Sequence, residues 1–256
     1  MMSNSSPLDT AEYNHNYSQF YDTLTAHRGY QEDCAHLSSY VRSKGYTDIL
    51  DFGCGTGSHL QMLSELLSDT RLYGFDLSEH MSNIARSKPG RHQVLDTLTG
   101  LETHFDFIYS LYNVINCIPN HTKELYSTLE NTVRHLKNRS SILLEMWSLD
   151  SVLEDPPIPL ERTFDQENII RQCIPDISQL HSHNLFTLNY YIRNAQNHLF
   201  AEDHQKIHLH HLDEILEFLK KHGFKTSYSD SLSLLEAPDS AMDQAGRFIF
   251  ILGERT

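Results

Sequence analysis

The chain has 256 residues, of which 39% are hydrophobic, and it carries a formal net charge of −14. This length and composition suit one domain with an added elaboration. The acidic balance, together with the lack of basic runs interleaved with aromatic residues, disfavours a nucleic-acid partner.

Membrane and secretory classes are disfavoured as well. No stretch of about 18 apolar residues occurs, as a spanning helix would need. The polar start, MMSNSSPLDTAEY, does not resemble a signal peptide. The four cysteines lie far apart without a CxxC pair: Cys34, Cys54, Cys117 and Cys173. We therefore expect a reduced, cytoplasmic protein.

The 17 histidines include two short clusters, at 181–183 and 208–211. Neither cluster has the HExxH spacing of a helical zinc site, and no cysteine lies beside them. We expect solvated histidines and no metal.

Helices and strands alternate through the first part of the chain. We expect no regular structure over 1–16. The pattern then predicts a helix at 31–44 ended by Gly45, a strand at 47–52, helix 59–67, strand 71–77, helix 78–87, strands 91–98 and 105–112, helix 123–137 and strand 141–147. Such alternation is typical of a parallel sheet that is covered by helices on both faces.

The alternation stops after residue 150. The segment DPPIPLER is a break signal, and the segments at 184–194 and 198–210 predict antiparallel strands. A helix at 212–224, ended by Gly223, and a strand at 247–254 follow. The predicted fold class is α/β, with a doubly wound, Rossmann-like sheet and an antiparallel β cap insertion. The predicted domains are an N-terminal lid segment (1–34), a core (35–150 and 207–256) and the cap (151–206).

Three glycines follow the first strand at every second position, in ILDFGCGTGS. Glycine lets a backbone approach a ligand closely, and the following helix offers its free N–H groups. A dinucleotide fingerprint, GxGxxG, would need its third glycine at Ser58 or at Leu60. The observed pattern is GxGxG, formed by Gly53, Gly55 and Gly57.

DFGCGTG resembles motif I of the class I S-adenosylmethionine-dependent methyltransferases, in which an acidic and a hydrophobic residue precede GxGxG. The resemblance places the glycine turn, with the backbone of Cys54, beneath the cofactor S-adenosyl-L-methionine. LYGFDLSEHM resembles the second motif: Asp76 ends the second strand, where a carboxylate can accept hydrogen bonds from a ribose diol. The resemblance further implies cofactor contacts from Leu77, Met81, Asp96, Thr97, Leu111 and Tyr30.

The region after the fourth strand indicates the kind of methyl acceptor. It lacks the Asn/Asp-Pro-Pro-aromatic motif of base-methylating enzymes, and LYNVINCI resembles small-molecule methyltransferases that act on sugars and amino sugars. FYDTLTAHRGYQE is similar to the lid segment of sugar N-methyltransferases, and LLEMW to the end of their fifth strand. Some of these enzymes carry a histidine where Cys117 stands here, so His121 is considered as a substitute base.

These features give the candidate acceptor residues. The predicted catalytic residues are Tyr21, Asn113 and His121. The predicted substrate-binding residues are Tyr17, Asn116, Glu145 and Trp147. Glu145 stands out because its neighbours on the strand are apolar, so its carboxylate needs a partner or water.

The sequence therefore predicts methyl transfer from S-adenosylmethionine to a small polar metabolite, with a free or nucleotide-linked sugar or amino sugar as the leading acceptor. The cofactor becomes S-adenosyl-L-homocysteine in the reaction. Alternatives are an O-methyltransferase of a glycan or another metabolite, a non-catalytic cofactor-binding protein, and a NAD-dependent oxidoreductase, which the missing third glycine disfavours. A homodimer is left open, and no nucleic-acid or membrane partner is expected.

Overall fold

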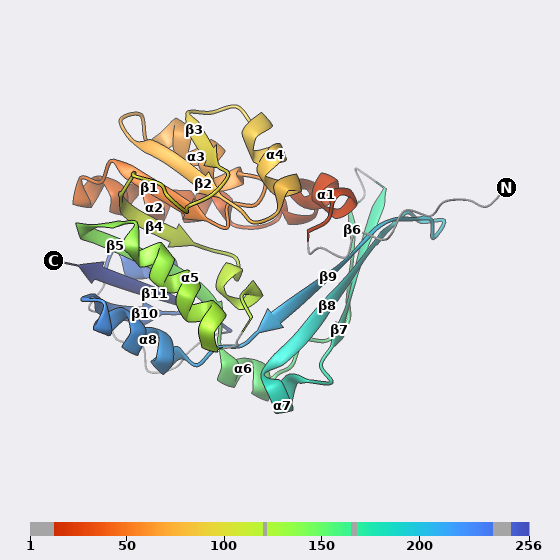
Figure 1. Ribbon diagram of the computed structural model, residues 1–256. Helices are drawn as coiled ribbons and strands as arrows, with labels where there is room; N and C mark the ends of the chain where they lie inside the picture. The colour runs from red at the N-terminus through yellow and green to blue at the C-terminus, as the bar shows by residue number, and fades with distance from the viewer. Residues whose placement is uncertain (1–12, 120–121, 165–167, 238–246, 256) are drawn as a thin grey trace.

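The protein is built on two separate β-sheets (Figure 1). The computed structural model describes residues 13–119, 122–164, 168–237 and 247–255. The larger sheet has seven strands in the order β10-β11-β5-β4-β1-β2-β3, and the smaller has four in the order β6-β7-β8-β9.

The seven-stranded sheet is parallel except for β11, which pairs antiparallel with both β5 and β10. Its strands are β1 (Asp48–Phe52), β2 (Arg71–Phe75), β3 (His92–Leu95), β4 (Phe105–Ser110), β5 (Leu136–Trp147), β10 (Lys225–Ser229) and β11 (Phe248–Arg255). The chain leaves β1 toward β2 on one side and returns to β4 on the other. In open α/β sheets, ligands bind at the carboxyl ends of the strands at such a reversal.

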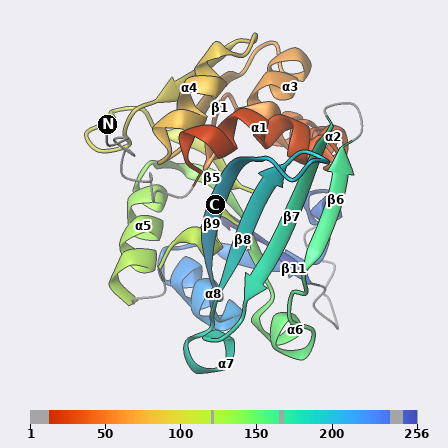
Figure 2. The ribbon, with the colours of Figure 1, turned by 90° about the vertical axis from the view of Figure 1, so that its right-hand side faces the viewer.

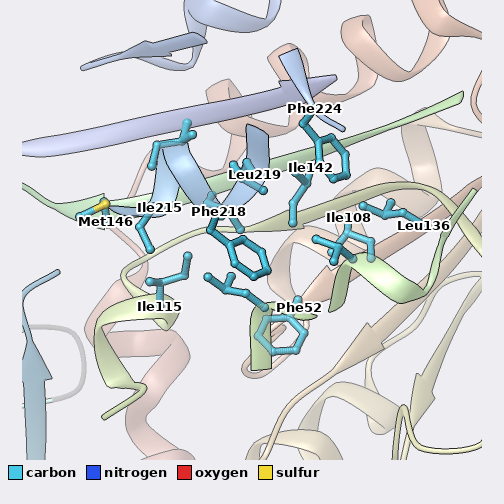
Figure 3. Packing of buried hydrophobic residues seen from close by; sticks show 14 of the residues in the cluster. Phe52, Ile108, Ile115, Leu136, Ile142, Met146, Ile215, Phe218, Leu219 and Phe224 are labelled. Carbon is cyan, nitrogen blue, oxygen red and sulfur yellow. The ribbon is translucent and has the colours of Figure 1, made fainter. Parts of the chain in front are cut away.

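Helices cover both faces of this sheet. One face carries α2 (Tyr30–Lys44), α3 (Ser58–Leu66) and α4 (Glu79–Ser87), and the other carries α5 (Thr122–Arg134) and α8 (Leu212–Lys221). On the second face, Phe218 and Leu219 of α8 meet Ile142 and Ile108 of the sheet in a buried apolar cluster (Figure 3). The continuous apolar strands follow from this two-sided burial.

The four-stranded sheet stands beside the larger one at the carboxyl ends of its strands (Figure 1). It is antiparallel and consists of β6 (Leu160–Phe164), β7 (Ile169–Asp176), β8 (Leu185–Arg193) and β9 (Leu199–His208), with the short helices α6 (Leu149–Glu154) and α7 (Leu180–His183) near it. Helix α1 (His15–Thr25) crosses one end of this sheet (Figure 2). Tyr17 and Leu24 of α1 pack on Ile192 and Ala201 of the sheet.

The predicted fold class is confirmed: a Rossmann-like α/β sheet with helices on both faces, and an antiparallel sheet beside it. The prediction of no regular structure near the N-terminus is wrong from His15 onward, where α1 begins; residues 1–12 lie outside the described part. Strand β5 begins at Leu136, earlier than expected, so α5 ends at Arg134. The proposed boundary between residues 34 and 35 falls inside α2, and the domain division remains a prediction. Within the described ranges, no helix is long and apolar enough to cross a membrane.

Candidate active site

The glycine turn joins β1 to α3 in a conformation that other residues rarely adopt. Gly53, Gly55 and Gly57 have φ of +82°, +53° and +78°. A Cβ at Gly53 would lie 2.4 Å from a Val114 methyl carbon, so a side chain is excluded there by contact as well as by backbone strain. The amide groups of Gly53 and Cys54 donate to the Phe75 carbonyl at 2.7 and 3.0 Å, which fixes the turn against β2.

Asp76 connects the end of β2 to this turn. Its Oδ2 accepts a hydrogen bond from the Gly55 N–H at 2.8 Å, and its Oδ1 accepts one from the Ser78 N–H at 2.8 Å. Burial raises the pKa of Asp76, while these two N–H groups oppose the rise by favouring the charged form. Asp76 is therefore held in place with its carboxylate beside the glycine backbone.

A cavity of about 700 Å³ lies over the glycine turn and Asp76. Asp51, the acidic residue that precedes the turn, lies on its wall with Oδ2 buried and unpartnered by any described residue. Burial raises the pKa of Asp51 to about 6. The cavity thus offers one carboxylate suited to a cationic amine and a second, Asp76, suited to a sugar diol.

These features fit S-adenosylmethionine, whose methyl-bearing sulfonium is already a strong electrophile. Asp76 would hold the ribose diol and Asp51 would face the amino end. Cys54, Met81 and Leu111, for which contacts with the cofactor are predicted, line the cavity, and so does Leu77, although 90% of its surface is exposed. Tyr30 also lines it, and its hydroxyl donates to Thr25 Oγ1 at 3.2 Å.

Asp96 and Thr97 do not reach this cavity. Both side chains are exposed just beyond β3, and Asp96 forms an ion pair with Arg86 of α4 on the outer surface. Leu95 and Leu98 on either side of them are buried in the core, and this burial orients the two polar side chains outward. The predicted contacts of Asp96 and Thr97 with the cofactor have no support in this geometry.

Helix α1 covers the cofactor cavity. Tyr21 of α1 lies on its wall above Gly55. Asp22 of α1 accepts hydrogen bonds from the Thr56 and Ser58 hydroxyls, at 2.5 and 3.3 Å, and pairs with Lys88 Nζ at 2.7 Å. One carboxylate of the lid thereby joins the glycine turn to the end of α4.

We expect Asp22→Asn to weaken S-adenosylmethionine binding about threefold, because a partly exposed ion pair contributes little by itself but here also holds the lid. Titration calorimetry measures the change. Glu130→Gln, which removes a surface ion pair with Arg134 on α5, is the matched control and should bind the cofactor as the wild type does. Equal affinities in both variants would contradict the lid's role.

A second cavity, of about 480 Å³, adjoins the first. The two share Tyr13, Leu111, Tyr112 and Cys117 as lining residues. The second cavity lies between the seven-stranded sheet and the inner face of the four-stranded sheet, and is lined among others by Arg28, Asp33, Glu145, Trp147, Tyr190 and Gln205. We call it the acceptor cavity below.

Glu145 of β5 is the buried carboxylate of the acceptor cavity, with 6% of its surface exposed. It accepts a hydrogen bond from the Tyr112 N–H at 2.6 Å. Burial raises the pKa of Glu145 to about 7, although that hydrogen bond and the charge of Arg28 act to lower it. A carboxyl with such a pKa can exchange a proton near neutral pH.

Tyr112 organises the polar groups around Glu145. Its φ is +59°, and its hydroxyl donates to Asp33 Oδ2 at 2.5 Å. The Arg28 guanidinium carbon lies 4.4 Å from the centre of the Tyr112 ring, and the His59 ring stacks on it at 5.4 Å. His59 Nε2 also lies 3.3 Å from Asp33. The acceptor cavity is thus bordered by a fixed network of charged and aromatic groups.

Two further predicted residues present unpartnered polar atoms at this cavity. Asn113 Oδ1 and Trp147 Nε1 are buried without a hydrogen-bond partner in the described part of the chain. Asn113 has φ of +66°, so the backbone itself turns at this point. Buried polar groups are nearly always paired, so these two atoms indicate a ligand with matching groups.

Other predicted residues serve the framework. Asn116 donates to the His208 carbonyl at 2.7 Å and accepts from the Trp147 N–H at 2.8 Å, which joins the two sheets. Tyr17 packs on Tyr190, with ring centres 5.7 Å apart, and lines neither cavity. Tyr21 lies on the cofactor side and accepts a hydrogen bond from Arg28 at 3.0 Å. His121 lies outside the described residues.

Four residues of the two cavities and their lid are not predicted from the sequence: Arg28, Asp33, Asp22 and Asp51. Asp51 is the acidic residue of the motif that contains the glycine turn, so its position beside the cofactor cavity could have been predicted from the motif. Arg28 and Asp33 lie at the junction of the lid and α2, and only the packing of α2 against Tyr112 brings them to the cavity. A contact between segments so far apart in the sequence has no signal in the local sequence pattern.

Comparison with known proteins agrees with this geometry. The methyltransferase domain family matches residues 15–228. A curated relative, dTDP-3-amino-3,4,6-trideoxy-alpha-D-glucopyranose N,N-dimethyltransferase of Streptomyces venezuelae, is 26% identical over 150 residues, which span 56% of this chain and 62% of the relative.

Two solved structures share the fold over nearly their full length. A sugar N-methyltransferase from Streptoalloteichus has a TM-score of 0.75 at 21% identity, covering all of this chain and 98% of that one. An amino pentose methyltransferase from Micromonospora echinaspora has a TM-score of 0.68 at 18% identity, covering 96% and 99%. Because the family match covers most of the chain, this protein belongs to the methyltransferase domain family, and S-adenosylmethionine is the cofactor that its glycine turn and cavity fit.

Proposed function

We propose that this protein transfers a methyl group from S-adenosylmethionine to the amine of an amino sugar, with a nucleotide-linked sugar as the leading form. The observation that carries the proposal is Glu145: a buried carboxylate on the wall of a cavity that adjoins the cofactor cavity. The curated relative from Streptomyces venezuelae and the solved structure from Micromonospora echinaspora are both described as methyltransferases of amino sugars. These similarities support an amino sugar as the acceptor.

An amine is protonated in neutral water, and only its uncharged form attacks a methyl group. Glu145 and Asp33 offer negative charge to the ammonium form as it enters. Glu145, with a pKa near neutrality, then accepts the proton and leaves a nucleophilic nitrogen. Asn113 and Trp147 supply an acceptor and a donor for neighbouring hydroxyls of the sugar.

The remaining residues align the reactants. Tyr13, Leu111, Tyr112 and Cys117 border both cavities, so they surround the line along which the methyl group passes. Helix α1, held by Asp22, covers this region and excludes water. Alignment and exclusion of water are the main demands that a sulfonium donor makes on the protein.

The second candidate is O-methylation of a sugar hydroxyl, which the same cavity would admit. A hydroxyl has no positive charge, so it gains less from two carboxylates, and it needs a stronger base than Glu145. A non-catalytic cofactor-binding protein is disfavoured because the acceptor cavity contains unpartnered buried polar groups in place of an apolar filling.

A matched pair of acceptors tests the proposal. The full chain is incubated with S-adenosylmethionine and either a nucleotide-linked amino sugar or the same sugar with a hydroxyl in place of the amine. We expect mass spectrometry to find a methyl group added to the amine compound alone. Methylation of the hydroxyl compound alone would favour the second candidate, and methylation of neither compound would contradict an amino-sugar acceptor.

A further inference from the structure

Two arginines of the four-stranded sheet occupy directly opposite positions on neighbouring strands. Arg162 of β6 pairs with Arg171 of β7. Opposite residues of an antiparallel pair project from the same face with Cβ atoms about 5 Å apart, and like charges placed there destabilise the sheet. Such an arrangement calls for a negative group between or above the two guanidinium groups.

The arginine pair faces the inner side of the sheet, toward the acceptor cavity. Arg171 lies two residues from both Ile169 and Cys173 on β7, so the three side chains share one face of the strand. Ile169 and Cys173 are buried in the inner clusters. The Arg171 guanidinium carbon lies 5.6 Å from the centre of the Tyr190 ring, and Tyr190 lines the acceptor cavity. The pair therefore continues the wall of the cavity toward the edge strand β6.

No described carboxylate neutralises this pair: in the ranges that the structure covers, no ion pair includes Arg162 or Arg171. Glu161, the neighbour of Arg162, projects from the opposite face and pairs with Arg193 at 2.6 Å. An acid adjacent in sequence is thus directed away from the arginines.

His27, which follows α1, links the arginine pair to the cavity. It lines the acceptor cavity. Burial, and then the charges of Arg162, Arg171 and Arg28, lower its pKa, so these groups share one positive region. This region stands out in a chain whose net charge is −14.

We propose that Arg162 and Arg171 bind a phosphate or diphosphate group of the acceptor at the rim of the acceptor cavity. The inference rests on the proposed function: the amine lies at Glu145 and the anionic part of the same molecule lies at the arginine pair. Guanidinium groups bind phosphate oxygens through two parallel hydrogen bonds each. A sugar that carries a nucleoside diphosphate has both required groups, and a free sugar lacks the second.

Titration calorimetry with inorganic pyrophosphate tests the site in the full chain at constant ionic strength. We expect binding to the wild type, and about tenfold weaker binding to Arg162→Gln and to Arg171→Gln, since each loses charge-assisted hydrogen bonds. Arg193→Gln, on the opposite face of the same sheet, is the matched control and should bind like the wild type. Absence of binding to the wild type, or an equal loss in Arg193→Gln, would overturn the site. The Tm of Arg162→Gln should be unchanged or raised, because a like-charge contact is removed.

Kinetics separate this inference from the proposed function. Arg171→Gln should raise the KM of a nucleotide-linked amino sugar about tenfold and leave the KM of the phosphate-free amino sugar unchanged. If amines are methylated but Arg171→Gln changes neither KM, the arginine site is wrong and the proposed function stands. If pyrophosphate binds as expected but no amine is methylated, the proposed function is wrong and the anion site stands.

Competition by orthophosphate, pyrophosphate and a nucleoside diphosphate distinguishes a sugar phosphate from a nucleotide-linked sugar, since the matching group competes most strongly.

Discussion

Asp76→Ala is expected to weaken S-adenosylmethionine binding by at least about 100-fold. The substitution removes a carboxylate that would accept two charge-assisted hydrogen bonds from the ribose diol, each contributing about 1.5–3 kcal/mol. It also removes the acceptor for the Gly55 and Ser78 N–H groups, so the glycine turn loses a support. Titration calorimetry with S-adenosylmethionine and S-adenosylhomocysteine measures the loss.

Asp96→Ala is the control for Asp76→Ala, because Asp96 is the acid that follows the next strand. Its side chain is 89% exposed and pairs with Arg86 outside the cavity. We expect its cofactor affinity to lie within twofold of the wild type. A loss comparable to that of Asp76→Ala would restore Asp96 as a cofactor residue, whereas unchanged affinity in Asp76→Ala would overturn the placement of the cofactor itself.

Glu145→Gln should reduce kcat/KM for an amine acceptor about 100-fold or more and leave cofactor affinity unchanged. The amide keeps the size of the side chain and can still accept from the Tyr112 N–H, but it neither pairs with an ammonium nor takes its proton. Glu254→Gln is the matched control: Glu254 belongs to the neighbouring strand β11 at the far end of the sheet, where it pairs with Lys44. Equal losses in both variants would assign a structural role to Glu145.

The pH profile gives Glu145 a second signature. Because its pKa is raised to about 7, the wild type should lose activity as the pH falls through 7 and the carboxylate takes up a proton. The raised pKa also means that ionisation of Glu145 costs folding free energy above its unfolded pKa. Glu145→Gln should therefore be more stable than the wild type at pH 8, by up to about 3 kcal/mol, and equal to it below pH 4. Chemical denaturation at the two pH values measures this; a variant that is less stable at pH 8 would contradict the buried charge.

The residues of the two cavities differ in how well they can be predicted from the sequence. The glycine turn, Asp76 and Met81 lie within one continuous strand–turn–helix segment and its successor, so local spacing is enough to place them. Asp96 follows the same spacing rule, yet its neighbours Leu95 and Leu98 are buried in the core and its own side chain lies on the surface beside Arg86. A spacing rule predicts where the backbone lies and leaves the direction of an exposed side chain undetermined.

The acceptor cavity depends on contacts between distant segments. Glu145 could be recognised because a carboxylate among buried strand residues is unusual. Arg28 and Asp33 reach the cavity only through Tyr112, which lies about 80 residues away in sequence. Tyr17 and Asn116 have residue types that suit a binding site, but they are used in packing and in joining the two sheets. Residue type alone does not separate a polar group that binds a ligand from one that holds the framework.

The division of the molecule into two sheets has a consequence for evolution and for engineering. The cavity that fits the cofactor is lined mainly by the turns of the seven-stranded sheet, whereas Leu188, Tyr190, Gln205 and Ile207 of the four-stranded sheet line the proposed acceptor cavity. Substitutions on that wall can change which acceptor is accommodated and leave the donor site intact. We therefore expect that acceptor specificity can change while the methyl-donor site is retained. A library of variants that targets β8 and β9 would exploit this separation.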